Sequence, residues 1–186
     1  EHVFTNDLIA LNFIRSDFAL RNNTLARHYG VEGVQGSHLR PVKLAAGSAR
    51  GGVLTQGSIL LMGSDGVESN PIYRGVWLRK RLFADPPPPP PPGAPPLEQK
   101  DKTKLSIKEQ IALHREEAAC ARCHNKIDPW GIAFEAYDPT GRLKSATFDA
   151  STILPDGAEV DGLRSLQDYV VQSKSSDFAN GLARRI

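Results

Sequence analysis

Cys120-Ala121-Arg122-Cys123-His124 is the stretch from which the rest of this sequence is interpreted. It holds both cysteines of the chain, three positions apart, and a histidine follows directly. Two thiols and an imidazole in this order are typical of a c-type haem site, where the thiols bond to the haem vinyl groups and the histidine binds iron. Because positions i, i+3 and i+4 share one face of a helix, we expect Cys120, Cys123 and His124 to face a single haem.

Three other interpretations of these residues stay open. A structural zinc site needs four Cys or His ligands, so histidines would have to complete it. A thioredoxin-like redox pair needs a strand before the cysteines, whereas the preceding sequence is helical in pattern. The simplest alternative is a pair of buried free cysteines beside a surface histidine.

The length and composition of the chain are those of a globular protein. The chain has 186 residues, 40% of them hydrophobic, and a net charge of +2, which suits one sizeable globular domain or two small ones. Because Lys and Arg are matched by Asp and Glu, we expect no nucleic-acid partner.

No apolar run approaches the roughly 20 residues of a membrane span. The chain begins at Glu1 and its last helical pattern stops at Ile186, so we expect a piece of a longer protein.

The segment before the motif predicts a helix. Ser106-Ile107-Lys108-Glu109 is a capping box, a strong helix start, and we expect this helix to carry the motif at its C-terminal end. Asp128-Pro129 is expected to stop it. His114 lies ten residues before His124, about 15 Å along a continuous helix, so it is not expected to be the second iron ligand.

Two residues are candidates for the second axial position on the iron. Met62 is the sole methionine, and thioether ligation is common in cytochromes c. The alternative is that Met62 fills a gap in the core. His28 could also be a distal ligand, or simply a surface histidine near a helix C-terminus.

The remaining patterns predict further elements. Residues 3–30 are expected to be helical with breaks, and Asn70-Pro71 is expected to begin a helix whose arginines face solvent. Residues 51–62 are expected to form a buried helix or a strand, and their length favours the helix. Other predictions are a polyproline spacer or strap over 86–96, a hairpin turn at Pro155-Asp156-Gly157, and helices over 165–173 and 176–186.

The order of these motifs resembles the planctomycete cytochrome-c-like domain of large secreted proteins, a domain of unknown function. The resemblance rests on Gly51 to Ser58, Asn70-Pro71, Arg74 to Leu78, the proline run, His114-Arg115, Cys120 to His124 and Ile127-Asp128-Pro129-x-Gly131. In addition, Leu25 to Gly30 resembles the end of the domain that usually precedes it, and Leu154 to Gly162 the start of the domain that follows.

The resemblance implies one covalent haem c on Cys120, Cys123 and His124, in a periplasmic or otherwise exported protein. We therefore expect a mainly α, cytochrome-c-like helical haem domain with long irregular loops and a small β-hairpin near the C-terminus. The expected division is residues 1–50 from a preceding helical domain, 51–145 as the haem domain, and 146–186 as the start of a following domain.

Two functions follow as hypotheses. The first is an electron-transfer module that exchanges electrons with a redox partner protein or with other domains of the same polypeptide. The second is a haem enzyme with an open sixth coordination site and a peroxidase-like or oxidative activity. In the second case His28 or Arg27 would act as a distal acid or base.

Overall fold

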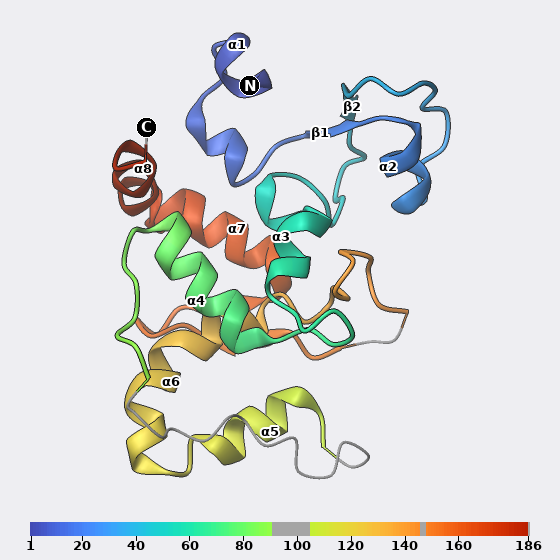
Figure 1. Ribbon diagram of the computed structural model, residues 1–186. Coiled ribbons are helices and arrows are strands. Elements are labelled where there is room, and N and C mark those ends of the chain that lie inside the picture. Colours follow the sequence, from blue (N-terminus) through green and yellow to red (C-terminus); the bar gives the residue numbers. More distant parts are fainter. Residues whose placement is uncertain (91–104, 146–147, 186) are drawn as a thin grey trace.

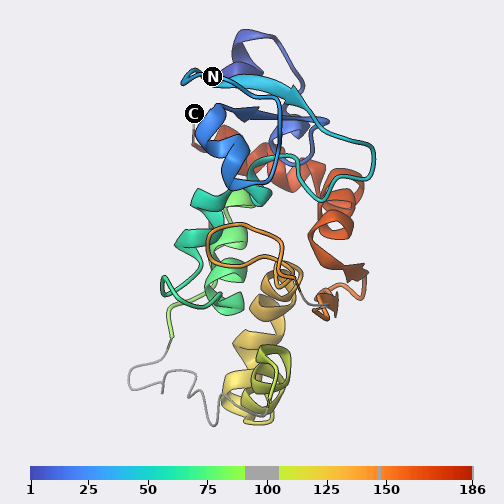
Figure 2. The ribbon, with the colours of Figure 1, turned by 90° about the vertical axis from the view of Figure 1, so that its right-hand side faces the viewer.

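The computed structural model describes residues 1–90, 105–145 and 148–185. The molecule is elongated and mainly helical (Figures 1 and 2), and both chain termini lie at one end of it. Its helices are α1 (His2–Thr5), η1 (Ala10–Phe13), α2 (Asn23–His28), η2 (Val53–Thr55), α3 (Gly57–Met62), α4 (Pro71–Leu82), α5 (Ile107–His114), α6 (Ala118–Ile132), α7 (Gly162–Ser173) and α8 (Ser175–Ala183). This confirms the predicted mainly α composition.

Two antiparallel hairpins accompany the helices. The predicted C-terminal hairpin is confirmed as β3 (Ser151–Ile153) and β4 (Glu159–Asp161), joined by a turn in which Gly157 has a positive φ of 89°. A second hairpin, β1 (Phe18–Arg21) with β2 (Arg40–Lys43), was not predicted. The helical prediction for residues 3–30 is therefore wrong at β1, because Phe18–Arg21 pairs with a strand 22 residues further on, which local periodicity does not report.

The centre of the molecule is the packing of α4 against α6. Asn70 caps α4 by accepting a hydrogen bond from the Tyr73 backbone N–H, as the sequence predicted. Gly75 on α4 and Gly131 on α6 allow the helices to touch, because a Cβ at either position would collide with a backbone carbonyl of the other helix. The contacts Gly75 to Ile127 and Gly131 to Pro71 show that the helices run antiparallel.

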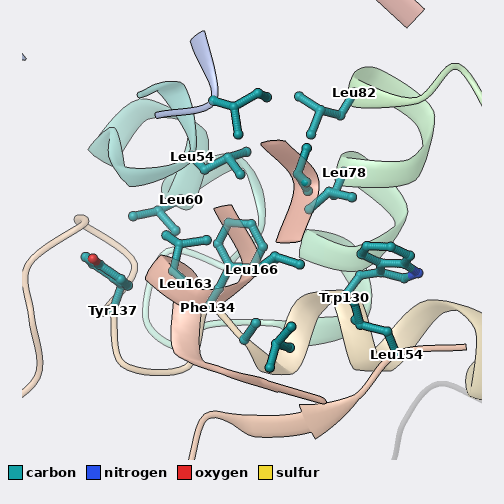
Figure 3. Close-up of a cluster of buried hydrophobic side chains, with 14 of the residues drawn as sticks. Leu54, Leu60, Leu78, Leu82, Trp130, Phe134, Tyr137, Leu154, Leu163 and Leu166 are labelled. Carbon is teal, nitrogen blue, oxygen red and sulfur yellow. The ribbon is translucent and has the colours of Figure 1, made fainter. Parts of the chain in front are cut away.

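Apolar side chains from the whole chain form one core around this helix pair (Figure 3). It includes Ile14, Phe134 and Leu166, one from each of the three predicted segments of the chain. The division into domains itself stays a prediction. Residues 86–90 of the predicted proline segment form neither helix nor strand, and residues 91–96 lie outside the described residues.

One prediction about α4 is wrong. Arg74 was expected to face solvent, but it is only 2% exposed. Its guanidinium lies 3.5 Å from the buried carboxylate of Glu135, and it donates hydrogen bonds to the Phe134 and Tyr137 carbonyls at 3.0 and 3.1 Å. Arg74 of α4 thus binds backbone carbonyls in the turns that follow α6, so these buried acceptors have a hydrogen-bond partner.

The predicted apolar helix over residues 51–62 is interrupted. It consists of the 3-10 turn η2 and the short helix α3, separated by an extended residue, Gln56. Within residues 1–90, 105–145 and 148–185, no helix combines the length and the apolar character that crossing a membrane requires.

Candidate haem site

The Cys-x-x-Cys-His motif lies at the start of α6, just after α5, at the end of the molecule opposite the termini (Figures 1 and 2). The capping box is confirmed: the Glu109 carboxylate accepts a hydrogen bond from the Ser106 backbone N–H at 2.7 Å. However, α5 ends at His114, and α6 begins at Ala118 after a turn. The prediction that one helix runs from Ser106 through the motif is therefore wrong.

The prediction that Asp128-Pro129 stops the helix is also wrong. α6 continues through Pro129 to Ile132. Residues 127–135 are all buried, so tertiary packing of this segment outweighs the hydrogen bond that proline cannot donate.

The three motif residues lie within one turn of α6. Cys120 and Cys123 are free thiols, both half-buried, and His124 follows at the i+4 position. Ala118 and Ala119, which precede them on the helix, are exposed. Two thiols and an imidazole are thus held together by a single helical turn, as the spacing predicted, on a part of α6 that the core does not cover.

Asp128 holds the His124 ring in place. Nδ1 of His124 lies 2.9 Å from Oδ1 and 3.2 Å from Oδ2 of Asp128, whose side chain is 0% exposed. With Nδ1 engaged, Nε2 is the ring nitrogen available to a ligand. The sequence interpretation treated Asp128 only as a helix stop. The signal that could have identified it is the i, i+4 spacing of His124 and Asp128.

His114 also lies beside the motif histidine. Its ring centroid is 4.6 Å from that of His124, in an edge-on arrangement. The expectation of a 15 Å separation assumed a continuous helix, and the turn over residues 115–117 folds α5 back instead. Burial lowers the pKa of His114, and His124 acts in the same direction against an opposing effect of Asp128.

The two candidates for the second axial position lie elsewhere. His28 belongs to α2, at the opposite end of the molecule from the motif in both ribbon views (Figures 1 and 2). Its Nε2 lies 2.9 Å from the Thr140 carbonyl oxygen, and Arg142 donates to its backbone carbonyl. Met62 ends α3 and is 59% exposed. The residues that contact the His124 side chain are instead His114, through its ring, and Asp128, through its carboxylate.

The alternative of a zinc site gains no support from the geometry. Across the part of the chain that the structure describes, no three His, Cys, Asp or Glu side chains converge on a point that could hold a metal ion. The thiols, His124 and Asp128 instead follow one another along a single helix.

The fold and this site define a class: a mainly helical protein that presents a Cys-x-x-Cys-His motif at the exposed start of a helix whose other end is buried. The family model PSCyt3, described as a protein of unknown function (DUF1588), matches residues 50–147. That is more than half of the chain, and the chain belongs to this family, which is planctomycete and cytochrome-like. No curated protein and no solved structure matches the chain.

Proposed function

We propose that this chain is a c-type cytochrome module that holds one covalent haem and transfers electrons. Cys120 and Cys123 form the two thioethers, and His124 Nε2 is the proximal ligand of the iron. The observation that carries the proposal is the combination of two free thiols and an oriented imidazole on one exposed helical turn. The membership in a cytochrome-like family supports it.

The donor set suits this cofactor. Covalent attachment needs two reduced thiols at a fixed spacing, and both cysteines are free and partly accessible. Iron ligation needs a neutral imidazole whose second nitrogen is held by another group. Asp128 accepts the Nδ1–H of His124 and so fixes both the tautomer and the ring orientation. When bound, haem c supplies an iron that alternates between ferric and ferrous states.

Asp128 acts on the iron only through His124. A buried carboxylate that accepts the imidazole N–H raises the basicity of the other ring nitrogen. A more basic ligand favours the ferric state, so Asp128 lowers the reduction potential of the proposed cofactor. His114, packed edge-on against His124, limits the rotation of that ring from the side of α5.

Attachment of haem c takes place outside the cytoplasm, so the proposal includes a periplasmic or otherwise exported location. The electrons pass to a redox partner protein or to another domain of the same polypeptide. The exposed turns of α5 and α6 are the surface on which this exchange takes place, because electron transfer needs a short path to the cofactor.

The second candidate is a haem enzyme with an open sixth site. The His124–Asp128 pair is the observation that favours it, since a strongly basic proximal ligand also stabilises oxidised iron in catalysis.

Carbon monoxide separates the two functions. The chain is produced in a periplasm together with a cytochrome c maturation system, reduced, and exposed to carbon monoxide. An electron carrier with two protein ligands shows reversible ferric and ferrous spectra and no rapid spectral change with carbon monoxide. Rapid carbon monoxide binding contradicts the electron-transfer proposal and supports the enzyme. The Cys120→Ser, Cys123→Ser double variant is the control for the covalent site.

A further inference from the structure

Arg21, at the end of β1, is a buried cation that has no counter-ion among the described residues. The residue is 3% exposed, and its Nε has no hydrogen-bond partner in the part of the chain that the structure describes. Its guanidinium lies over the face of Tyr29, with the guanidinium carbon 5.5 Å from the ring centroid. Burying an unpaired charge is costly, and a guanidinium carries five donors that need acceptors.

A second arginine adds to the positive charge. The guanidinium carbon of Arg50 lies 4.2 Å from the centroid of the same Tyr29 ring. One of its nitrogens donates to the Thr55 carbonyl at 3.1 Å. Burial lowers the pKa of Arg21, and the nearby charge of Arg50 lowers it further. A buried arginine, Arg21, and a half-buried one, Arg50, thus both lie over the ring of Tyr29.

Arg74 is as deeply buried as Arg21, and the Nε atoms of both lack a partner among the described residues. The two terminal nitrogens of Arg74, however, donate to backbone carbonyls, and one of them lies 3.5 Å from the Glu135 carboxylate. The contrast indicates that Arg21 is built for a partner that is not part of the described chain.

Both Arg21 and Arg50 line a cavity of about 360 Å³. Its other walls are largely apolar and include Phe13, Phe18 and Val53. Glu1 is the acidic residue among those that line it. The volume lies within the range typical of small-molecule sites, which combine apolar walls with a few polar groups.

We propose that this cavity binds a small organic carboxylate with an apolar body. The guanidinium of Arg21 pairs with the carboxylate, since its fork of N–H groups matches two carboxylate oxygens. Arg50 adds a second positive charge, and the aromatic walls receive the apolar part of the ligand. The cavity is lined by residues of α1, η1 and β1, elements that lie at the end of the molecule opposite the start of α6 (Figure 1), so the proposal does not depend on haem.

The chain offers a matched control. Arg40 on β2 is the register partner of Arg21, but it is exposed and does not line the cavity. Binding of 3-phenylpropionate is measured by isothermal titration calorimetry on the full chain and on the variants Arg21→Gln, Arg50→Gln and Arg40→Gln. Neutral 3-phenylpropionamide and inorganic phosphate are the comparison probes.

The expected result is saturable binding of 3-phenylpropionate, weakened about tenfold or more by Arg21→Gln and changed less than about twofold by Arg40→Gln. The amide and inorganic phosphate bind at least about tenfold more weakly than the carboxylate. Because Arg21→Gln removes an unpaired buried charge, we also expect it to leave the melting temperature of the ligand-free chain unchanged or raised. If Arg21→Gln fails to fold, Arg50→Gln is tested in its place, and a smaller loss of affinity for 3-phenylpropionate is expected.

Three outcomes overturn the proposal. One is no binding of 3-phenylpropionate at concentrations up to about 10 mM. Another is equal binding of the acid and its amide, which removes the role of the charge. The third is an equal loss of affinity in Arg40→Gln and Arg21→Gln, which shows non-specific attraction to positive charge.

Discussion

The two halves of α6 differ sharply in their surroundings. From Ile127 to Ile132 every residue is buried, packed against α4 and the core, whereas residues 118–126 are exposed or half-buried. The cysteines and His124 lie in the exposed half, and Asp128 lies in the first turn of the buried half. One helix thus combines a rigid anchor with an accessible reactive turn, and the His124–Asp128 hydrogen bond joins them.

The largest effect is expected from Arg74→Met, a substitution on α4 that removes contacts to the residues following the buried half of α6. The substitution leaves the buried Glu135 without Arg74 and frees the carbonyls that follow α6. Removing one partner of a buried ion pair costs about 3–5 kcal/mol of unfolding free energy, and because Lys144 remains 3.3 Å from Glu135, we expect the lower end of this range. Chemical denaturation measures it, with the exposed Arg81→Met on the same helix as the control. Equal losses in both variants would show that the buried pair is not what holds the anchor.

Gly131→Ala tests the contact between α4 and α6 directly. The added methyl group meets the backbone carbonyl of Pro71, so the helices must separate. Overpacking of this kind costs about 1–3 kcal/mol of unfolding free energy, occasionally more. In the exposed half, Asn125→Ala is expected to change stability by no more than about 0.5 kcal/mol. Similar losses of unfolding free energy in Gly131→Ala and Asn125→Ala would contradict the distinction between the buried and the exposed half of α6.

Asp128→Asn acts at the junction of the halves. Asparagine keeps an oxygen that accepts the His124 N–H but removes the charge that raises the basicity of the ring. If the substitution lowers the preference of His124 for ferric over ferrous iron about tenfold, the reduction potential of the haem-loaded chain rises by about 60 mV. Spectroelectrochemistry measures the shift.

The matched control for Asp128→Asn is Glu116→Gln, which removes an exposed carboxylate close to the motif in sequence. Water and salt screen that charge, so we expect a clearly smaller shift. A potential that stays constant in Asp128→Asn contradicts the role given to this carboxylate.

The smallest effect is expected where α5 attaches to the rest of the molecule. The ammonium group of Lys108 lies 2.6 Å from the Asp149 carboxylate, and this hydrogen bond, with those from Ser151, lowers the pKa of Asp149 to about 2. Because the pKa is depressed in the folded state, the stabilisation is present above pH 3.8 and is lost as the pH falls from 3.8 towards 2. Amide hydrogen exchange in α5 should therefore be faster in Asp149→Asn than in the wild type at pH 7, and the difference should vanish near pH 2.

Local chemistry allowed part of this fold to be predicted. The side chain of Asn70, the Ser106 capping box and the Pro155-Asp156-Gly157 turn act within four residues of sequence, and all three are confirmed. The i, i+3, i+4 spacing of the motif likewise placed its residues on one helical turn.

The features that the sequence concealed depend on long-range packing. Arg115, Glu116 and Glu117 have good helix propensities, yet α5 ends before them and folds back. Pro129 lies inside a helix because its surroundings are buried. Arg74 resembled a solvent-facing residue until its partner, 61 positions later, was known. Neither the β1–β2 pairing nor the cavity beside Arg21 has a local signal.

The most direct test of the central claim is the intact mass of the chain after production with a cytochrome c maturation system. The account predicts an increase of about 616 Da per chain, the mass of one haem, located on the peptide that contains Cys120 and Cys123. The double variant Cys120→Ser, Cys123→Ser should have its unmodified mass. An unmodified wild-type chain, in cells that mature a control cytochrome normally, would contradict the account.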